Sequence, residues 1–235
     1  MLKASHFIGK YLDPLAVRWS MTRGELLFAA FLVFSFLTGV QAHLMPGVYP
    51  LTKDITDALL LVVCAPLLWF IYQRHQGNRF WWWWGLTYLS TFFIEVAGVA
   101  TGSIFGAYAY GPTMWVQWLN VPLVIALNWT LLILAMHQIA SYLVPKSSLI
   151  TALLTGVLIM AYDFCIEPVA IALDYWTWEA VDIPLQNYLA WGIIAFLFSW
   201  PLSHFEIGCR HPLLMVYGVA QLAFFLLLQA LFIAP

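Results

Sequence analysis

Apolar residues run along this chain in long stretches that polar positions interrupt only briefly, a pattern typical of helices that cross a membrane. A helix needs about 17–25 apolar residues to cross a hydrocarbon layer of about 30 Å. Such windows occur seven times, at 25–44, 57–73, 81–100, 119–143, 149–167, 187–203 and 212–233. The pattern predicts an all-α polytopic membrane protein, with seven transmembrane helices forming a single domain over residues 25–235.

Composition supports this class. Of the 235 residues, 63% are hydrophobic and 9% are charged, which excludes an ordinary soluble globular domain. Residues 1–24 are basic and have no apolar centre followed by a small-residue cleavage site, so we interpret them as a cytoplasmic N-terminal segment and not as a signal peptide. The spacing of Thr22 and Glu25 predicts a capping box that opens the first span.

Basic residues divide unevenly between the two sides that the spans define. With a cytoplasmic N-terminus, Lys53 alone falls on the outer side. Cytoplasmic loops of membrane proteins carry the excess of Lys and Arg. We therefore expect a multi-pass protein of the inner cell membrane, with its N-terminus in the cytoplasm and its C-terminus outside. The residues on the cytoplasmic side are Lys3, Lys10, Arg18, Arg23, Arg74, Arg79, Lys146 and Arg210.

Two ten-residue segments resemble each other. NVPLVIALNW (120–129) and DIPLQNYLAW (182–191) share Pro, Leu, Leu and Trp in register. Each opens a span, with its proline expected in the first helical turn, where the missing N–H costs nothing. We interpret 81–143 and 149–203 as repeated hairpins. The loops 101–118 and 172–186 are strongly aromatic, and we expect them to be lids at the outer membrane interface.

Carboxylates at membrane depth are the strongest candidates for chemistry. Placing a charge there costs about 2.5–3.5 kcal/mol on insertion scales, so such residues are usually functional. Glu95, Asp163 and Glu167 lie in the outer halves of their spans, and so do the amides Asn128 and Asn187. Asp163 and Glu167 are four residues apart, on one helix face. Two carboxyls that close do not both ionise easily, so one is expected to keep its proton.

Structural interpretations of these residues stay open. Gly98, Gly102 and Gly106 form a small-residue pattern that lets helices pack closely, and Glu95 could then bond to a neighbouring helix. The carboxyls at 163 and 167 could belong to a polar network between helices. A further group has metal-ligand side chains but falls in a short cytoplasmic turn, where we expect solvated residues and no metal site. That group is His204, Glu206, Cys209 and His211.

Several common sites are absent from the sequence. It has no Gly-x-Gly-x-x-Gly, no Walker loop, no Gly-x-Ser-x-Gly and no paired His-x-x-His-His boxes. Dinucleotide, nucleotide-phosphate and di-iron oxygenase chemistry therefore lack their usual apparatus. We expect no cofactor and no nucleic-acid partner. Chemistry by carboxylic acids alone remains open.

The residues around these carboxylates resemble the signature of the CruF carotenoid hydratases, over roughly residues 85–205. At 167 the chain has Glu where the family pattern favours Asp. The resemblance is carried by Glu95-x-x-Gly98-x-x-Thr101-Gly102-x-x-Phe105-Gly106-x-Tyr108-x-Tyr110, by Val121-Pro122 with Trp129, by Asp163-x-x-x-Glu167-Pro168-Val169, by Trp176-x-Trp178, and by Ile183-Pro184-x-x-Asn187-Tyr188-x-x-Trp191.

This resemblance implies a cofactor-independent hydro-lyase of the bisanhydrobacterioruberin hydratase and gamma-carotene hydroxylase type, which adds water to the terminal double bond of an acyclic carotenoid end. Asp163 or Glu95 would be the acid, and Glu167 or the remaining carboxylate the base on the water side. Aromatic faces can stabilise a tertiary cation. The expected substrate- or water-binding residues are Asn128, Asn187, Thr101, Tyr108, Tyr110, Trp176 and Trp178.

Two other functions remain open. A carotenoid end-cyclase would share the protonation step, but an internal double bond would capture the cation. A protein of another class would bind carotenoid or relay protons without catalysis. The expected partners are a lipophilic carotenoid, the lipid bilayer and other membrane enzymes of the carotenoid pathway.

Overall fold

The protein is built almost entirely of helices. The computed structural model describes residues 17–144, 147–180 and 182–233, so most of the predicted N-terminal segment and the basic residues Lys3, Lys10 and Lys146 lie outside the described residues. The fold is all-α, with 76% of the described residues helical. The long helices are α2 (Arg23–Leu44), α4 (Thr56–Arg74), α5 (Asn78–Thr101), α6 (Leu123–Leu143), α7 (Ser148–Ala172), α8 (Leu185–His204) and α9 (Pro212–Leu228), with short α3 (Tyr49–Asp54) and the π-helical turn η1 (Gln229–Ile233).

Each predicted span coincides with one of these long helices. Five of them are long and apolar enough to cross a membrane, namely α2, α4, α6, α7 and α9 with its π-helical end. The two others, α5 and α8, contain many Trp, Tyr and small polar residues, which lower their mean hydropathy. The chain is therefore an all-α protein with several membrane-spanning helices.

Local signals at the helix starts are visible in the structure. The predicted capping box is present: the Glu25 amide donates to Thr22 Oγ1 at 3.2 Å, and the Thr22 amide donates to Glu25 Oε2 at 2.6 Å. Pro122 and Pro184 were expected inside the first turn, and this is wrong by one residue. Both have extended backbone and stand at the N-cap positions of α6 and α8.

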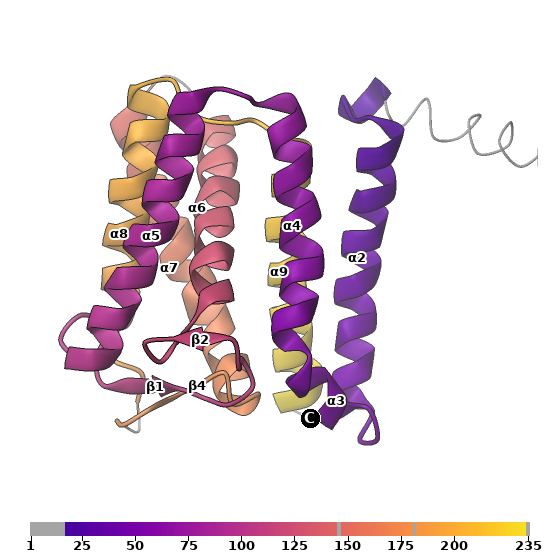
Figure 1. Ribbon diagram of the computed structural model, residues 1–235, viewed down its shortest axis with the longest axis vertical. Helices are drawn as coiled ribbons and strands as arrows, with labels where there is room; N and C mark the ends of the chain where they lie inside the picture. The colour runs from indigo at the N-terminus through magenta and orange to yellow at the C-terminus, as the bar shows by residue number, and fades with distance from the viewer. Residues whose placement is uncertain (1–16, 145–146, 181, 234–235) are drawn as a thin grey trace, which may run out of the picture.

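Helix α6 is the centre of the bundle. It packs against α4, α5, α7, α8 and α9, and 89% of its spanning window is buried. Helix α2 packs mainly on α9 and has only 22% of its window buried. Figure 1 shows α2 and α4 on one side of the bundle and α5 and α8 on the other.

Four short strands lie at one end of the bundle, which we call the strand end (Figure 1). The two predicted lids meet there, because β1 (Tyr108–Tyr110) pairs antiparallel with β4 (Trp176–Trp178). Tyr108 lies opposite Trp178, and Tyr110 lies opposite Trp176. A second small pair joins β2 (Gln117–Trp118) to β3 (Val121–Pro122).

The glycines that follow Glu95 do not pack two helices together, which corrects that expectation. Helix α5 ends at Thr101, and Gly102 caps it with a φ of 63°. A Cβ atom on Gly98 would lie 2.5 Å from the Phe105 ring, and one on Gly106, whose φ is 109°, would lie 2.7 Å from Pro184. The missing side chains therefore let the loop fold back over the end of its own helix and reach the start of α8.

The turn before α9 is also more buried than the expected solvated turn. His211 is fully buried as the N-cap of α9, and its Nε2 lies 3.1 Å from Glu25 Oε1. Arg74 bonds the other oxygen of the same carboxylate. Burial lowers the pKa of His211, and nearby Arg74 lowers it further, whereas Glu25 raises it. This cluster joins α2, α4 and α9 at the end of the bundle opposite the strands.

Candidate active site

The three predicted carboxylates share one buried pocket at the strand end. Glu95 comes from α5, whereas Asp163 and Glu167 come from successive turns of α7. Each is at most 2% exposed, and so is Asn187 from the first turn of α8. The cavity between them holds about 20 Å³. Three helices thus bring three acids and one amide to a single point, which we call the acid pocket.

One amide connects the two carboxyls of α7. Asn187 Nδ2 donates to Asp163 Oδ2 at 2.7 Å and to Glu167 Oε1 at 3.0 Å. An amide nitrogen carries two hydrogens, so it can serve both acceptors at once. Asn187 therefore holds the two carboxyls in a defined relation to each other.

Glu167 receives further donors from the lid. Trp176 Nε1 and Trp178 Nε1 each donate to Glu167 Oε2 at 2.9 Å. Together with Asn187, three N–H groups point at this carboxyl. An indole or amide N–H only donates, so this set of partners matches an ionised carboxylate, which only accepts.

Glu95 is bound from the facing strand. The Tyr108 hydroxyl donates to Glu95 Oε2. Burial raises the pKa of Tyr108, and the adjacent Glu95 raises it further, so the phenol keeps its proton and remains a donor. Each side of the β1–β4 ribbon therefore bonds one acid, β1 through Tyr108 and β4 through its two tryptophans.

Aromatic rings form the rest of the wall. The rings of Trp129 and Trp191 stack with centroids 4.0 Å apart and planes 20° apart, and Phe105 stacks on Trp191 at 5.3 Å. Tyr108 packs against Trp178 at 5.1 Å. The faces of these rings are the natural neighbours of a cation that forms beside the acids.

Comparison with known families agrees with this geometry. A family model described as carotenoid biosynthesis protein matches residues 56–234. The chain belongs to the carotenoid biosynthesis protein family. No curated protein and no solved structure matches the chain significantly. Membership places the protein in carotenoid biosynthesis and fits a lipophilic substrate.

Most of the expected site residues of this family member line the acid pocket. Glu95, Asp163, Glu167, Asn187, Tyr108, Tyr110, Trp176 and Trp178 are all part of its wall. Three wall residues were not among the expected site residues, namely Phe105, Trp129 and Trp191. The repeat held a signal for two of them, because Trp129 and Trp191 are the last residues of the two matching segments.

Two expected residues lie elsewhere. Asn128 Oδ1 accepts hydrogen bonds from the Tyr217 hydroxyl and from Gln221 Nε2, the latter at 3.0 Å, and Asn128 lines a different cavity. Thr101 is exposed and donates to the Ala97 carbonyl at 2.7 Å. Among the described residues, no group of three His, Cys, Asp or Glu side chains is arranged to hold a metal ion.

Proposed function

We propose that this protein is a carotenoid hydratase, which adds water across the terminal double bond of an acyclic carotenoid end to give a tertiary alcohol. One observation carries the proposal. The acid pocket combines buried carboxyls and an amide with a cavity of about 20 Å³, which is room for about one water molecule. A water in this place has the polar partners that it needs.

The first step is protonation of the alkene. The acid gives its proton to the less substituted carbon of the double bond, and the π electrons form the new C–H bond. Asp163 is our candidate for the acid, because Glu167 beside it is surrounded by N–H donors and holds the negative charge. Exclusion of water by the aromatic lid keeps the proton from being lost to solvent.

The second step is capture of the tertiary cation. The ring faces of Trp129 and Tyr108 stabilise it, each by up to about 2 kcal/mol when water is excluded. The water oxygen forms the new C–O bond, and Glu167 accepts the proton that the water loses. Proton exchange between Glu167 and Asp163 restores the starting state. One water is consumed, and no net proton is released.

Glu95 completes the site from the other side. Its carboxyl lies under Tyr108 and faces the same cavity, so we assign it to electrostatic stabilisation of the cation and to holding the water. It is also the second candidate for the acid. Its removal is therefore expected to abolish product, whichever of these roles it has.

The remaining topology is part of the same proposal. We propose that all seven long helices span the inner cell membrane as one domain, with the N-terminus in the cytoplasm. Arg23, Arg74 and Arg79 lie at the helix ends opposite the strand end, which supports this orientation. The repeated hairpins 81–143 and 149–203 are supported by the stack of Trp129 on Trp191 and by the antiparallel pairing of β1 with β4.

Product analysis tests the proposal. The protein is expressed in a lycopene-making host that grows in water labelled with ¹⁸O. We expect carotenoid heavier by one labelled water per reacted end. An unchanged mass with altered retention would show a cyclase, unaltered carotenoid would show a non-catalytic binder or relay, and label taken from oxygen gas would show an oxygenase.

The carboxylates are tested with matched variants. Asp163→Asn, Glu95→Gln and Glu167→Gln are each expected to abolish the hydroxylated product while the protein stays in the membrane. Glu179→Gln is the control, because Glu179 adjoins Trp178 but is exposed. Normal product from all three acid variants would overturn the mechanism.

A further inference from the structure

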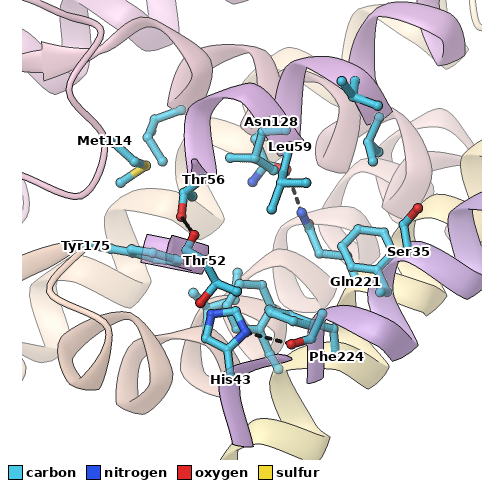
Figure 2. A pocket seen from close by; sticks show the side chains of 18 of the residues that line it. Ser35, His43, Thr52, Thr56, Leu59, Met114, Asn128, Tyr175, Gln221 and Phe224 are labelled. Carbon is cyan, nitrogen blue, oxygen red and sulfur yellow. Dashed lines mark hydrogen bonds between the residues drawn. The ribbon is translucent and has the colours of Figure 1, made fainter. Parts of the chain in front are cut away.

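A second cavity adjoins the acid pocket and is shown in Figure 2. Its volume is about 130 Å³, and side chains of α2, α3, α4, α6, α7 and α9 form its largely apolar wall. We call it the chain cavity. Trp129 and Trp176 line both this cavity and the acid pocket. An apolar chain seated here would therefore reach the acids past these two rings.

The chain cavity is open to the lipid side of the bundle. Phe31 of α2 and Leu59 and Val62 of α4 line it, and these side chains are 40%, 45% and 51% exposed. Figure 1 shows α2 and α4 running side by side on the outside of the bundle. A lipophilic ligand can therefore enter sideways from the bilayer without crossing water.

Most polar groups of the chain cavity already have partners. Thr52 Oγ1 donates to the Tyr49 carbonyl at 2.7 Å, and Thr56 Oγ1 donates to the Thr52 carbonyl at 3.1 Å. Gln221 Nε2 donates to Asn128 Oδ1 at 3.0 Å. Figure 2 shows the two threonines near His43 and the two amides together at another part of the wall. The two threonine hydroxyls and the Gln221 amide nitrogen therefore need no hydrogen bond from a ligand.

His43 is different, because one of its ring nitrogens is buried without a partner. The residue is 6% exposed, and Nε2 has no hydrogen bond among the described residues. Nδ1 lies 2.7 Å from the Gly39 carbonyl oxygen. A carbonyl oxygen can only accept, so Nδ1 carries the hydrogen, and in the neutral ring Nε2 is a bare acceptor. Leaving such an acceptor unpaired in an apolar place costs about 1–3 kcal/mol.

We propose that the chain cavity binds the apolar chain of a polyisoprenoid alcohol and that His43 Nε2 accepts a hydrogen bond from its hydroxyl group. The apolar wall matches the chain, and the bare acceptor requires a donor. An ammonium donor would bring a charge into this apolar space at high cost, whereas a hydroxyl group is neutral. The inference rests on the proposed function for the natural ligand, which would be a hydroxylated carotenoid.

A direct binding measurement tests whether the chain cavity binds the alcohol, and it does not require the protein to be catalytically active. The full-length protein in lipid nanodiscs is labelled with a photoreactive analogue of geranylgeraniol. Unlabelled geranylgeraniol and the hydrocarbon of the same skeleton are then compared as competitors of this labelling. One neutral hydrogen bond corresponds to about a two- to tenfold preference for the alcohol. His43→Phe is expected to remove that preference. His204→Phe, an exposed histidine at the opposite end of the bundle, is expected to keep it.

A second variant covers the case in which His43→Phe does not fold. Leu59→Trp narrows the cavity at its lipid side and is expected to reduce labelling by the alcohol and the hydrocarbon alike. Leu61→Trp is the control, since Leu61 is on the same helix and 47% exposed but is not in the cavity wall. Equal competition by alcohol and hydrocarbon in the unaltered protein would overturn the proposal. So would labelling found only at residues outside the wall of the chain cavity.

Two further experiments distinguish this inference from the proposed function. Asp163→Asn protein is expected to bind the alcohol normally, so a protein without hydratase activity still tests the chain cavity. Competition by carotenoid extracted before and after the reaction identifies the source of the hydroxyl. If His43→Phe weakens competition only by the carotenoid extracted after the reaction, the cavity binds the product. If it weakens competition by both carotenoid extracts, the substrate already carries a hydroxyl group.

Discussion

Replacing Asn187 by Leu is the sharpest perturbation of the acid pocket. The side chain keeps its approximate volume but loses the amide that donates to Asp163 at 2.7 Å and to Glu167 at 3.0 Å. A hydrogen bond to a charged group contributes about 1.5–3 kcal/mol, and one to a neutral group about 0.5–1.5 kcal/mol. With Glu167 ionised and Asp163 protonated, the loss is roughly 2–4.5 kcal/mol.

That loss sets the expected rate. If the transition state loses all of this hydrogen-bond energy, the rate falls about 30- to 2,000-fold, at about 1.4 kcal/mol per tenfold. The assay is the initial rate of hydroxylated carotenoid formation in isolated membranes, with product identified by mass. Thermal unfolding of the purified variant is followed in parallel, because part of the loss is expected as lower stability.

Gln186→Leu is the matched control for this variant. Gln186 precedes Asn187, is exposed and donates to the Ser103 carbonyl, outside the acid pocket. We expect its rate to remain within about twofold of the unaltered protein, as for most surface substitutions. A rate for Asn187→Leu that is also within twofold would refute the idea that this amide supports the acid pair. An equal fall in both variants would mean that the assay reports loop packing and not the carboxyls.

Two further predictions concern stability. Gly106→Ala is expected to lower the free energy of unfolding by about 1–3 kcal/mol, because the φ of Gly106 is 109° and the added Cβ would lie 2.7 Å from Pro184. Thermal unfolding measures this loss, and Gly47→Ala is the control, because Gly47 has open space around it. An unchanged melting temperature for Gly106→Ala would contradict the role of this glycine in the loop. Since the pKa of His211 is lowered from 6.5, its neutral form stabilises the fold fully above pH 6.5, and this contribution is lost as the pH falls toward the lowered folded-state value. His211→Gln should therefore flatten the decline in melting temperature between pH 7.5 and 5.5, and an equally steep decline would rule out His211 as its source.

Much of the architecture could be predicted from the sequence, because a membrane imposes simple conditions on it. The apolar windows give the positions of the long helices, since a backbone in lipid must satisfy its own hydrogen bonds. The cost of a carboxylate at membrane depth singles out Glu95, Asp163 and Glu167, and the structure gathers these three in one pocket. The capping box of Thr22 and Glu25 is equally local, and it forms as predicted.

Tertiary packing decided which side chains meet. Asn128 and Asn187 both lie in the outer halves of their spans, yet only Asn187 lines the acid pocket, because the direction in which each side chain points depends on how its helix is rotated against its neighbours. The pairing of β1 with β4 joins segments that are far apart in the chain, and it brings Trp176 and Trp178 to Glu167. The ring of His43, whose Nε2 is buried without a partner, is covered by Tyr49 of α3 and Phe224 of α9, so this bare acceptor arises only when those helices pack against α2. Hydrophobicity and local geometry are properties of short segments and can be read along the chain, whereas these contacts depend on how helices rotate against one another, which no single segment determines.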